Sequence, residues 1–205
     1  MLNHMAKNNS SHSQNTKKYA NKPRDEIRRK EYAVTDSAWI RALLTRGAFG
    51  SLGTVHNSQP FITPILYLYV EEEHAIYYHG ARVGRMRANV ELNPIVCFNV
   101  CEIGRILPAK NADNFNVEYN SVTVFGKAHV VKDEDEVVGI LEGLLYKYAP
   151  RLKPGEDYEH IKPEEINRTS VYKIDIEDWT GKQQKEDDDY PGAFYYEHMP
   201  VITRD

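Results

Sequence analysis

The most informative segment of the chain joins a strand-like run to an arginine-rich one, and it reads Tyr77-Tyr78-His79-Gly80-Ala81-Arg82-Val83-Gly84-Arg85-Met86-Arg87. The aromatic residues favour a β-strand, and the apolar stripe of Val83, Met86 and Val90 predicts a helix over residues 82–92. A helix N-terminus presents unpaired amides and partial positive charge, and guanidinium groups bind phosphate. The segment therefore predicts an anion site with Arg82 and Arg85 on one helix face, although the spacing alone fits a solvated basic helix as well.

The residues before this segment predict one helix and a meander of strands. Thr35 and Asp36 are candidate N-caps of a helix that ends at Gly47. We expect strands at residues 48–55, 61–70 and 74–79, because these runs have β-prone composition and are separated by turn residues.

The residues after it predict three more strands and a second long helix. The strands are expected at residues 95–101, 119–131 and 169–176, with a polar loop at 102–118 and a turn at 179–182. Asp133 is expected to cap a helix that ends before Pro150. Its wide core-facing stripe consists of Val137, Val138, Leu141, Leu144, Leu145 and Tyr148.

Six strands that do not alternate with helices exclude a βαβ architecture. We predict a mainly β (β+α) fold, a six-stranded antiparallel split β-barrel with flanking helices. This domain is expected to span residues 24–185. Residues 1–23 are expected to form a disordered tail, because they contain few branched apolar side chains, or to be an expression tag in part. Residues 186–205 are expected to form an acidic and aromatic tail that docks over the active groove or on the partner subunit, or else remains flexible and solvated.

The charge and hydropathy of the chain exclude several classes of partner. The chain has 205 residues and a net charge of −4, so no general positive field attracts nucleic acid. The longest nearly apolar run, residues 61–70, is far shorter than the ~20 residues that cross a bilayer. Since the N-terminal residues lack an apolar signal segment, we expect a cytoplasmic protein that binds neither membrane nor nucleic acid.

The cysteines and histidines do not predict a metal site. Cys97 and Cys101 are four residues apart on one predicted strand, roughly 13 Å apart, which is too far for a disulfide. We expect two reduced thiols. The histidines show no metal-ligand spacing, and the sequence contains no dinucleotide-binding, P-loop or nucleophile-elbow motif.

An ordered set of motifs gives the chain a family resemblance. The segment 77–87 is followed by Asn93-Pro94-Ile95-Val96-Cys97-Phe98 and by Ser121-Val122-Thr123-Val124-Phe125-Gly126, and residues 50–55, 60–67 and 179–182 also agree. Over residues 24–185 the chain resembles the FMN-binding split-barrel proteins related to pyridoxamine 5′-phosphate oxidase. It is most similar to their nitroimidazole-resistance branch, in which a strand ends in His-Gly-Ala before a basic helix.

The resemblance implies a homodimer with FMN in a groove at the two-fold interface, where both chains contribute contacts. It implies that the isoalloxazine lies along one strand, at Thr63, Pro64 and Ile65. His79 and Gly80 would lie beside the ribityl phosphate.

The remaining implied contacts are charged, hydroxyl and aromatic groups. Arg85 would bind the phosphate, Ser121 would offer a hydroxyl, and Lys182 would reach the flavin from the neighbouring subunit. Trp179 would stack on the flavin or cover it, unless it is plain packing.

One position departs from the family pattern, because relatives usually carry lysine where this chain has Met86. The apolar stripe predicts that Met86 packs into the core. Arg82 or Arg87 would then replace the missing charge, and FMN affinity in the micromolar range is one expectation.

The function that the resemblance implies is an FMN-dependent oxidoreductase. It would reduce a small aromatic or nitro compound with electrons from NAD(P)H or another reductant. His79 is the catalytic candidate, since imidazole titrates near neutral pH, and its alternative is a structural hydrogen bond. Two other functions remain open: a pyridoxamine-phosphate-oxidase-like enzyme and a non-catalytic flavin- or haem-binding module.

Overall fold

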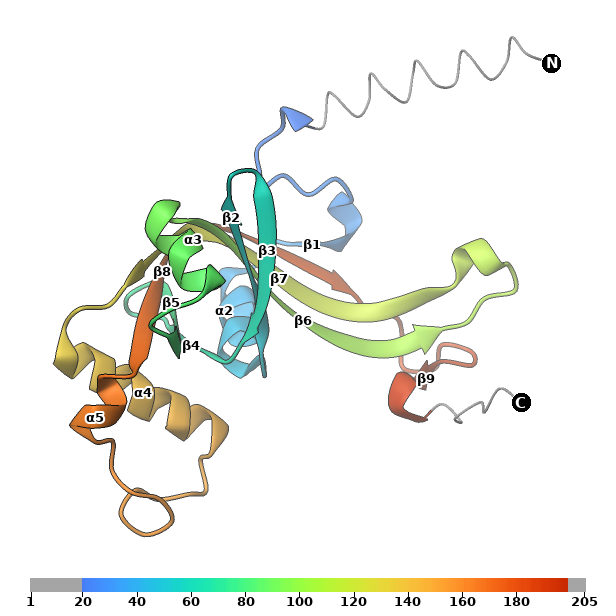
Figure 1. Ribbon diagram of the computed structural model, residues 1–205. Coiled ribbons are helices and arrows are strands. Elements are labelled where there is room, and N and C mark those ends of the chain that lie inside the picture. The colour runs from blue at the N-terminus through green and yellow to red at the C-terminus, as the bar shows by residue number, and fades with distance from the viewer. Residues whose placement is uncertain (1–19, 199–205) are drawn as a thin grey trace, which may run out of the picture.

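The computed structural model describes residues 20–198, and one antiparallel sheet dominates it (Figure 1). The strand order is β3-β2-β6-β7-β8-β5-β4, with β1 added to β8 and β9 added to β6. The strands are β1 Ala33–Val34, β2 Gly50–His56, β3 Gln59–Ile65, β4 Tyr67–Val70, β5 Ala75–Ala81, β6 Ile95–Leu107, β7 Asn116–Val130, β8 Thr169–Gln184 and β9 Phe194–Tyr195. The helices are η1 Lys30–Tyr32, α2 Ser37–Arg46, α3 Arg85–Leu92, η2 Ala112–Asn114, α4 Glu134–Tyr148, α5 Pro163–Ile166 and η3 Tyr196–His198.

The sheet is a split barrel, as predicted. Its two outer strands, β3 and β4, are consecutive in the chain but pair with β2 and β5 and not with each other. Only Leu66 lies between them, so the chain passes from one edge of the sheet to the other at this residue. The continuous strand predicted for residues 61–70 is therefore wrong, because its two halves pair with different neighbours.

Two apolar clusters cover opposite faces of β5. The first lies inside the barrel, where Tyr78 of β5 packs with Phe98 and Leu44 among others. The second packs Tyr77 of β5 against α4, which contributes the buried Val137, Ile140 and Leu144. Because successive strand residues point to opposite faces, β5 is buried from both sides.

Three boundaries differ from the sequence prediction. The polar loop predicted for residues 102–118 is largely a long hairpin, since β6 continues to Leu107 and β7 begins at Asn116. The turn predicted at 179–182 belongs to β8, which continues to Gln184 past a register shift opposite Phe125 and Gly126. Helix α3 begins at Arg85 and not at residue 82.

The predicted caps and thiols agree with the structure. The side chain of Asp36 accepts a hydrogen bond from the amide of Ala38 at the start of α2, and Asp133 accepts one from Glu136 at the start of α4. Cys97 and Cys101 are free cysteines.

The C-terminal segment docks on the β6–β7 hairpin of its own chain. Arg105 on β6 donates to both carboxylate oxygens of Glu118 on β7, at 2.8 and 2.6 Å, and both side chains are only 11% exposed. Arg105 also donates to the carbonyl oxygens of residues 186–188, and β9 pairs with β6. Of the predicted tails, residues 1–19 and 199–205 lie outside the described part of the chain.

Replacing Glu118 is expected to make stability less sensitive to acid. Its hydrogen bonds to the Arg105 side chain hold the pKa of Glu118 at about 2, below the ordinary 4.5. Its stabilising contribution is therefore present above pH 4.5 and lost as the pH falls towards 2. We expect Glu118→Gln to lower the free energy of unfolding at pH 7 by about 2–3 kcal/mol, because Arg105 loses its charged partner.

Urea unfolding between pH 2 and 7 measures this effect, with Glu142→Gln on the exposed face of α4 as the control. The variant is expected to lose less stability than the wild type between pH 4.5 and 2. An identical pH dependence in both proteins would contradict the role given to this ion pair.

Candidate functional site

A pocket of about 640 Å³ lies where β5 ends, between β3 and the start of α3. Residues from three segments line it: Phe61, Ile62, Thr63, Pro64, Ile65 and Leu66; His79, Gly80 and Ala81; and Val83, Gly84, Arg85, Met86 and Arg87. The structure thus brings together Thr63, Pro64, Ile65, His79, Gly80 and Arg85, which the sequence analysis had placed at one ligand.

The N-terminus of α3 opens into this pocket without a side-chain cap. Gly84 is the N-cap and has a φ of 137°, a conformation that favours glycine. The first intrahelical hydrogen bond runs from the amide of Ala88 to the carbonyl of Gly84. The amides of Arg85, Met86 and Arg87 therefore have no helical acceptor, which makes this end of α3 suited to an anion.

The three arginines of the segment have different partners. Arg82 donates to the carbonyl oxygens of Ile166 and Thr169, and Arg87 binds Glu91 and the hydroxyl of Ser170. Within residues 20–198, Arg85 makes no ion pair or side-chain hydrogen bond. Arg85 is thus the guanidinium available at the pocket.

This arrangement corrects one prediction about the arginines. Arg82 and Arg85 do not share a helix face, because the helix starts only at Arg85. Arg82 does not line the pocket, whereas Arg87 lines it and pairs with Glu91, so a substitute for lysine at position 86 stays a prediction. A contact between Arg82 and a ligand stays a prediction.

Met86 packs against the core, as the apolar stripe predicted. Its methyl group lies so close to Gly80 that a Cβ at that position would be 2.9 Å from it. Val83 does not join the stripe, since it is 82% exposed. Met86 therefore contributes an apolar side chain at the position where a lysine would add a second positive charge to that of Arg85.

The β3 wall of the pocket is apolar with one polar exception. The hydroxyl of Thr63 is buried and has no hydrogen-bond partner in the described part of the chain. A buried hydroxyl without a partner is costly to folding.

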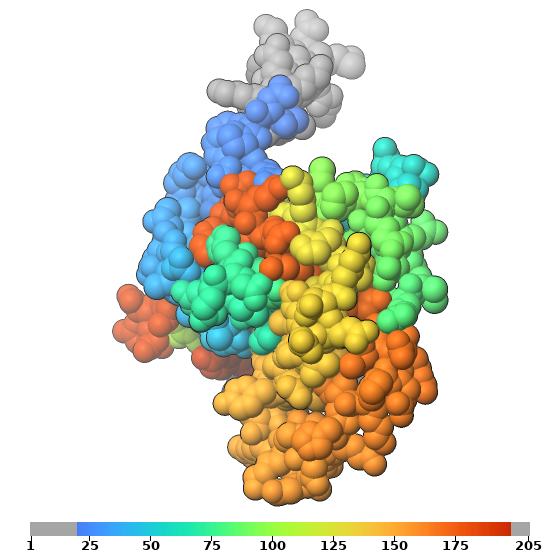
Figure 2. Space-filling view, turned by 90° about the vertical axis from the view of Figure 1, so that its left-hand side faces the viewer, coloured from blue at the N-terminus to red at the C-terminus, as the bar shows by residue number. Residues whose placement is uncertain are grey.

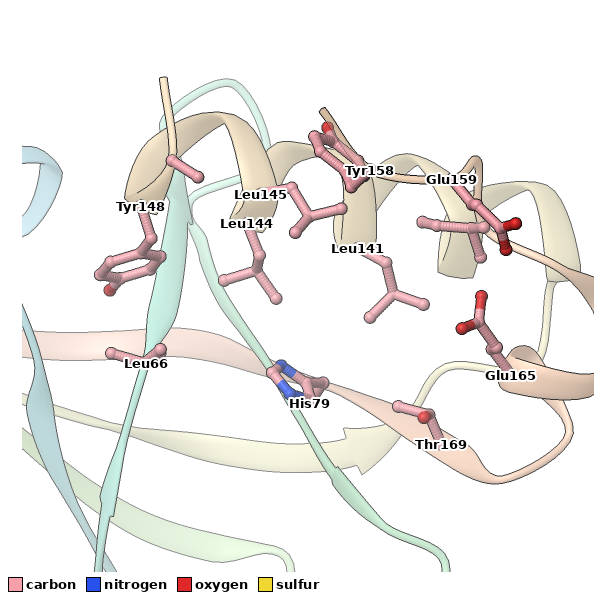
Figure 3. A pocket seen from close by; sticks show the side chains of 12 residues that line it. Leu66, His79, Leu141, Leu144, Leu145, Tyr148, Tyr158, Glu159, Glu165 and Thr169 are labelled. Carbon is pink, nitrogen blue, oxygen red and sulfur yellow. The ribbon is translucent and has the colours of Figure 1, made fainter. Parts of the chain in front are cut away.

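His79 and Leu66 also line a second pocket, of about 570 Å³, on the α4 side of β5 (Figure 3). His79 follows Tyr77 by two residues and therefore points to the same face of β5, towards α4. The other lining residues are Leu141, Leu144, Leu145, Tyr148, Ala149, Tyr158, Glu159, Ile161, Glu165 and Thr169. Figure 2 shows the chain from α4 to α5, in yellow to orange, as the lower part of the molecule. His79 thus stands between two neighbouring pockets.

Ser121 and Lys182 lie elsewhere, on adjacent strands and directly opposite each other in the β7–β8 register. Asn99 on β6 donates to the hydroxyl oxygens of Ser121 and Thr123, at 3.1 and 2.9 Å. Lys182 lines a third pocket, of about 350 Å³, together with Thr123, Thr180, Phe125 and residues of the segment 24–29. This pocket shares no lining residue with the pocket at α3.

Trp179 lies apart from all three pockets. Its ring makes an edge contact with His74, with ring centroids 4.7 Å apart, and lies under the guanidinium of Arg41. It also packs against the barrel core. These contacts fit the alternative that Trp179 packs against the protein itself. A contact between Trp179 and a flavin stays a prediction.

Sequence reasoning missed several of these features. Asn99 carried no motif, and its role depends on the pairing of β6 with β7. The leucines of α4 were interpreted only as core residues, although their spacing had placed them on one face. Among residues 20–198 no cluster of His, Cys, Asp and Glu is suited to a metal ion, and no helix is long and apolar enough to span a membrane.

A comparison with protein families matches residues 36–183 to the family described as Pyridoxamine 5′-phosphate oxidase. The chain belongs to this family. The match includes the strand-to-helix turn at α3 and the region that carries Ser121 and Lys182. The split barrel is thus the flavin-binding fold of this family. A search of curated proteins finds no match.

Solved structures share the fold at low sequence identity. The flavocytochrome Anf3 from Azotobacter vinelandii is 23% identical, with 89% of each chain covered and a TM-score of 0.70. The FAD and heme binding protein from Mycobacterium smegmatis is 18% identical over 76% of this chain and 74% of its own, with a TM-score of 0.68. A protein from Bacteroides thetaiotaomicron, described as a 5-nitroimidazole antibiotic resistance protein, is 18% identical over 74% and 86%, with a TM-score of 0.61.

Proposed function

We propose that the protein is a flavin-dependent oxidoreductase that binds FMN in the pocket between β3, β5 and α3. The observation that carries this proposal is the uncapped N-terminus of α3, with the free guanidinium of Arg85, at one end of an apolar pocket of about 640 Å³. The phosphate is expected at the α3 amides and the isoalloxazine along Thr63, Pro64 and Ile65.

The flavin, when bound, supplies hydride transfer, and the chain supplies binding, orientation and protection from water. Arg85 and the amides of α3 anchor the phosphate. The β3 wall shields one side of the ring system. We propose that His79, which lines both pockets, exchanges a proton with a small aromatic or nitro compound. We propose NAD(P)H or another reductant as the electron donor, and a cytoplasmic location.

Replacing Arg85 is expected to weaken FMN binding because the contact with the phosphate is lost, while the contacts with the ring system remain. We expect Arg85→Ala to raise the Kd for FMN by about ten- to a hundred-fold, because a charge-assisted hydrogen bond to phosphate is lost. Riboflavin, which lacks the phosphate, is expected to bind both proteins equally. Fluorescence titration with each flavin measures the two Kd values.

Arg151→Ala is the matched comparison, since Arg151 is an exposed arginine that lines none of the three pockets described above. We expect less than a two-fold change in its Kd for FMN. Equal losses for FMN and riboflavin in Arg85→Ala would be evidence against a phosphate contact at Arg85.

We further propose that the protein is a homodimer in which Ser121 and Lys182 reach the flavin of the partner. In one chain, these residues lie outside the α3 pocket, on the sheet face that also carries Ile95 and Ile103 of β6, which are 55% and 67% exposed. A second copy covering this face would bury them and complete the site.

Mixed dimers test this arrangement. In a dimer of an Arg85→Ala chain and a Lys182→Ala chain, one site combines the intact α3 pocket of one chain with the intact Lys182 of the other. We expect tag-purified mixed dimers to retain one FMN site of wild-type affinity per dimer, while each homodimeric variant binds weakly. A monomeric protein, or mixed dimers that bind no better than the homodimers, would overturn the shared site.

A second candidate function is a flavin–haem redox protein. The observation that favours it is the single imidazole of His79 at an apolar pocket next to the flavin pocket. The imidazole of His79 and the leucine-rich wall of α4 suit the ring of a haem group, which would supply one-electron chemistry, whereas Glu159 and Glu165 oppose its carboxylate side chains. The fold likeness to a flavocytochrome agrees with this candidate.

The absorbance spectrum of protein produced with haem in excess distinguishes the two candidates. The haem candidate predicts a Soret band that is lost in His79→Ala and kept in His129→Ala, whose histidine pairs with Asp175 away from this pocket. A spectrum that shows flavin bands only would leave the first candidate.

A further inference from the structure

The pocket on the α4 side of β5 has a long apolar interior (Figure 3). Leu141, Leu144 and Leu145 are spaced i, i+3 and i+4, so they lie on one face of α4 and line the pocket together. Leu66 and Ile161 complete the apolar lining, and the rings of Tyr148 and Tyr158 add aromatic surface. Walls of this composition bind flat aromatic compounds.

Its charged lining groups are all acidic. Figure 3 shows the carboxylates of Glu159 and Glu165 turned towards each other at one end of the pocket, with Tyr148 and Leu66 at the other. Both carboxylates contact Lys162, the first through its side chain and the second through its backbone amide at 2.9 Å, but Lys162 itself does not line the pocket. No arginine or lysine of residues 20–198 is among the lining residues.

We propose that this pocket binds the electron acceptor and selects aromatic compounds that are uncharged or positively charged. A ligand with a carboxylate or phosphate would bring a negative charge next to Glu159 and Glu165, with no cation in the lining to pair with it. Phosphorylated compounds such as pyridoxamine 5′-phosphate are therefore disfavoured. This inference rests on the proposed oxidoreductase function, because it places the acceptor against His79, which the flavin pocket shares.

Two probes of equal shape and opposite charge test the selection: 4-nitrobenzylamine and 4-nitrobenzoate. Equilibrium dialysis with the flavin-free full chain measures their binding. We expect the amine to bind at least about five-fold more tightly than the carboxylate, a modest ratio because solvent screens charges at the pocket mouth. Pyridoxamine 5′-phosphate is expected not to displace the amine.

Two variants assign the binding to this pocket. Glu159→Gln combined with Glu165→Gln keeps the hydrogen-bonding shape and is expected to reduce the preference for the amine to less than two-fold. Glu164→Gln, also on α5 but outside the pocket, is expected to keep it. Leu141→Trp is expected to block both probes by filling the interior, with circular dichroism as the check on folding.

The outcomes separate this inference from the proposed function. Selective amine binding in a protein that takes up no flavin would support the pocket and reject the flavin proposal. Flavin binding without any preference between the probes would leave the flavin proposal intact and overturn the inference. Haem that co-purifies with the protein and prevents probe binding would also overturn it.

Discussion

The structure depends on the burial of β5 from both sides. Ile76 and Tyr78 belong to the barrel core, while Ala75 and Tyr77 belong to the cluster under α4. A strand that is apolar on both faces is fixed in register, because a slip by one residue would exchange the two environments. Its last residues are fixed with it, and they include His79 and Gly80.

The two candidate pockets follow from this constraint. The alternation along β5 directs His79 to the α4 side, and the open backbone of Gly80 and Gly84 brings the start of α3 to the other side. Leu66, where the chain crosses between the two sheet edges, lines both pockets. A flavin and an electron acceptor held in these pockets would meet at His79 and Leu66. The C-terminal end of β5 would therefore contact both the cofactor and the acceptor.

Much of the fold could be predicted because its signals are local. The caps at Asp36 and Asp133 depend on neighbouring residues, and they lie where the sequence analysis placed them. The β6–β7 hairpin could not be predicted in full, since its polar strands are held together by the pair Arg105–Glu118, which is a tertiary contact. The split between β3 and β4 likewise depends on which neighbour each strand finds.

The candidate site was predictable only in part, for the same reason. The order of small residues and arginines indicated the pocket at α3, but the backbone at Gly84 decides that the helix starts at Arg85 and that Arg82 turns towards Ile166 and Thr169. The acidic end of the acceptor pocket depends on the path of the chain between α4 and α5, for which the sequence offers no periodic signal.

The most direct measurement is a crystal structure of the protein grown with FMN. The account predicts the phosphate at the amides of Met86 and Arg87 and the guanidinium of Arg85, with the ring system along Thr63, Pro64 and Ile65. A structure in which FMN binds elsewhere, or in which the N-terminus of α3 contacts only solvent at saturating FMN, would contradict it.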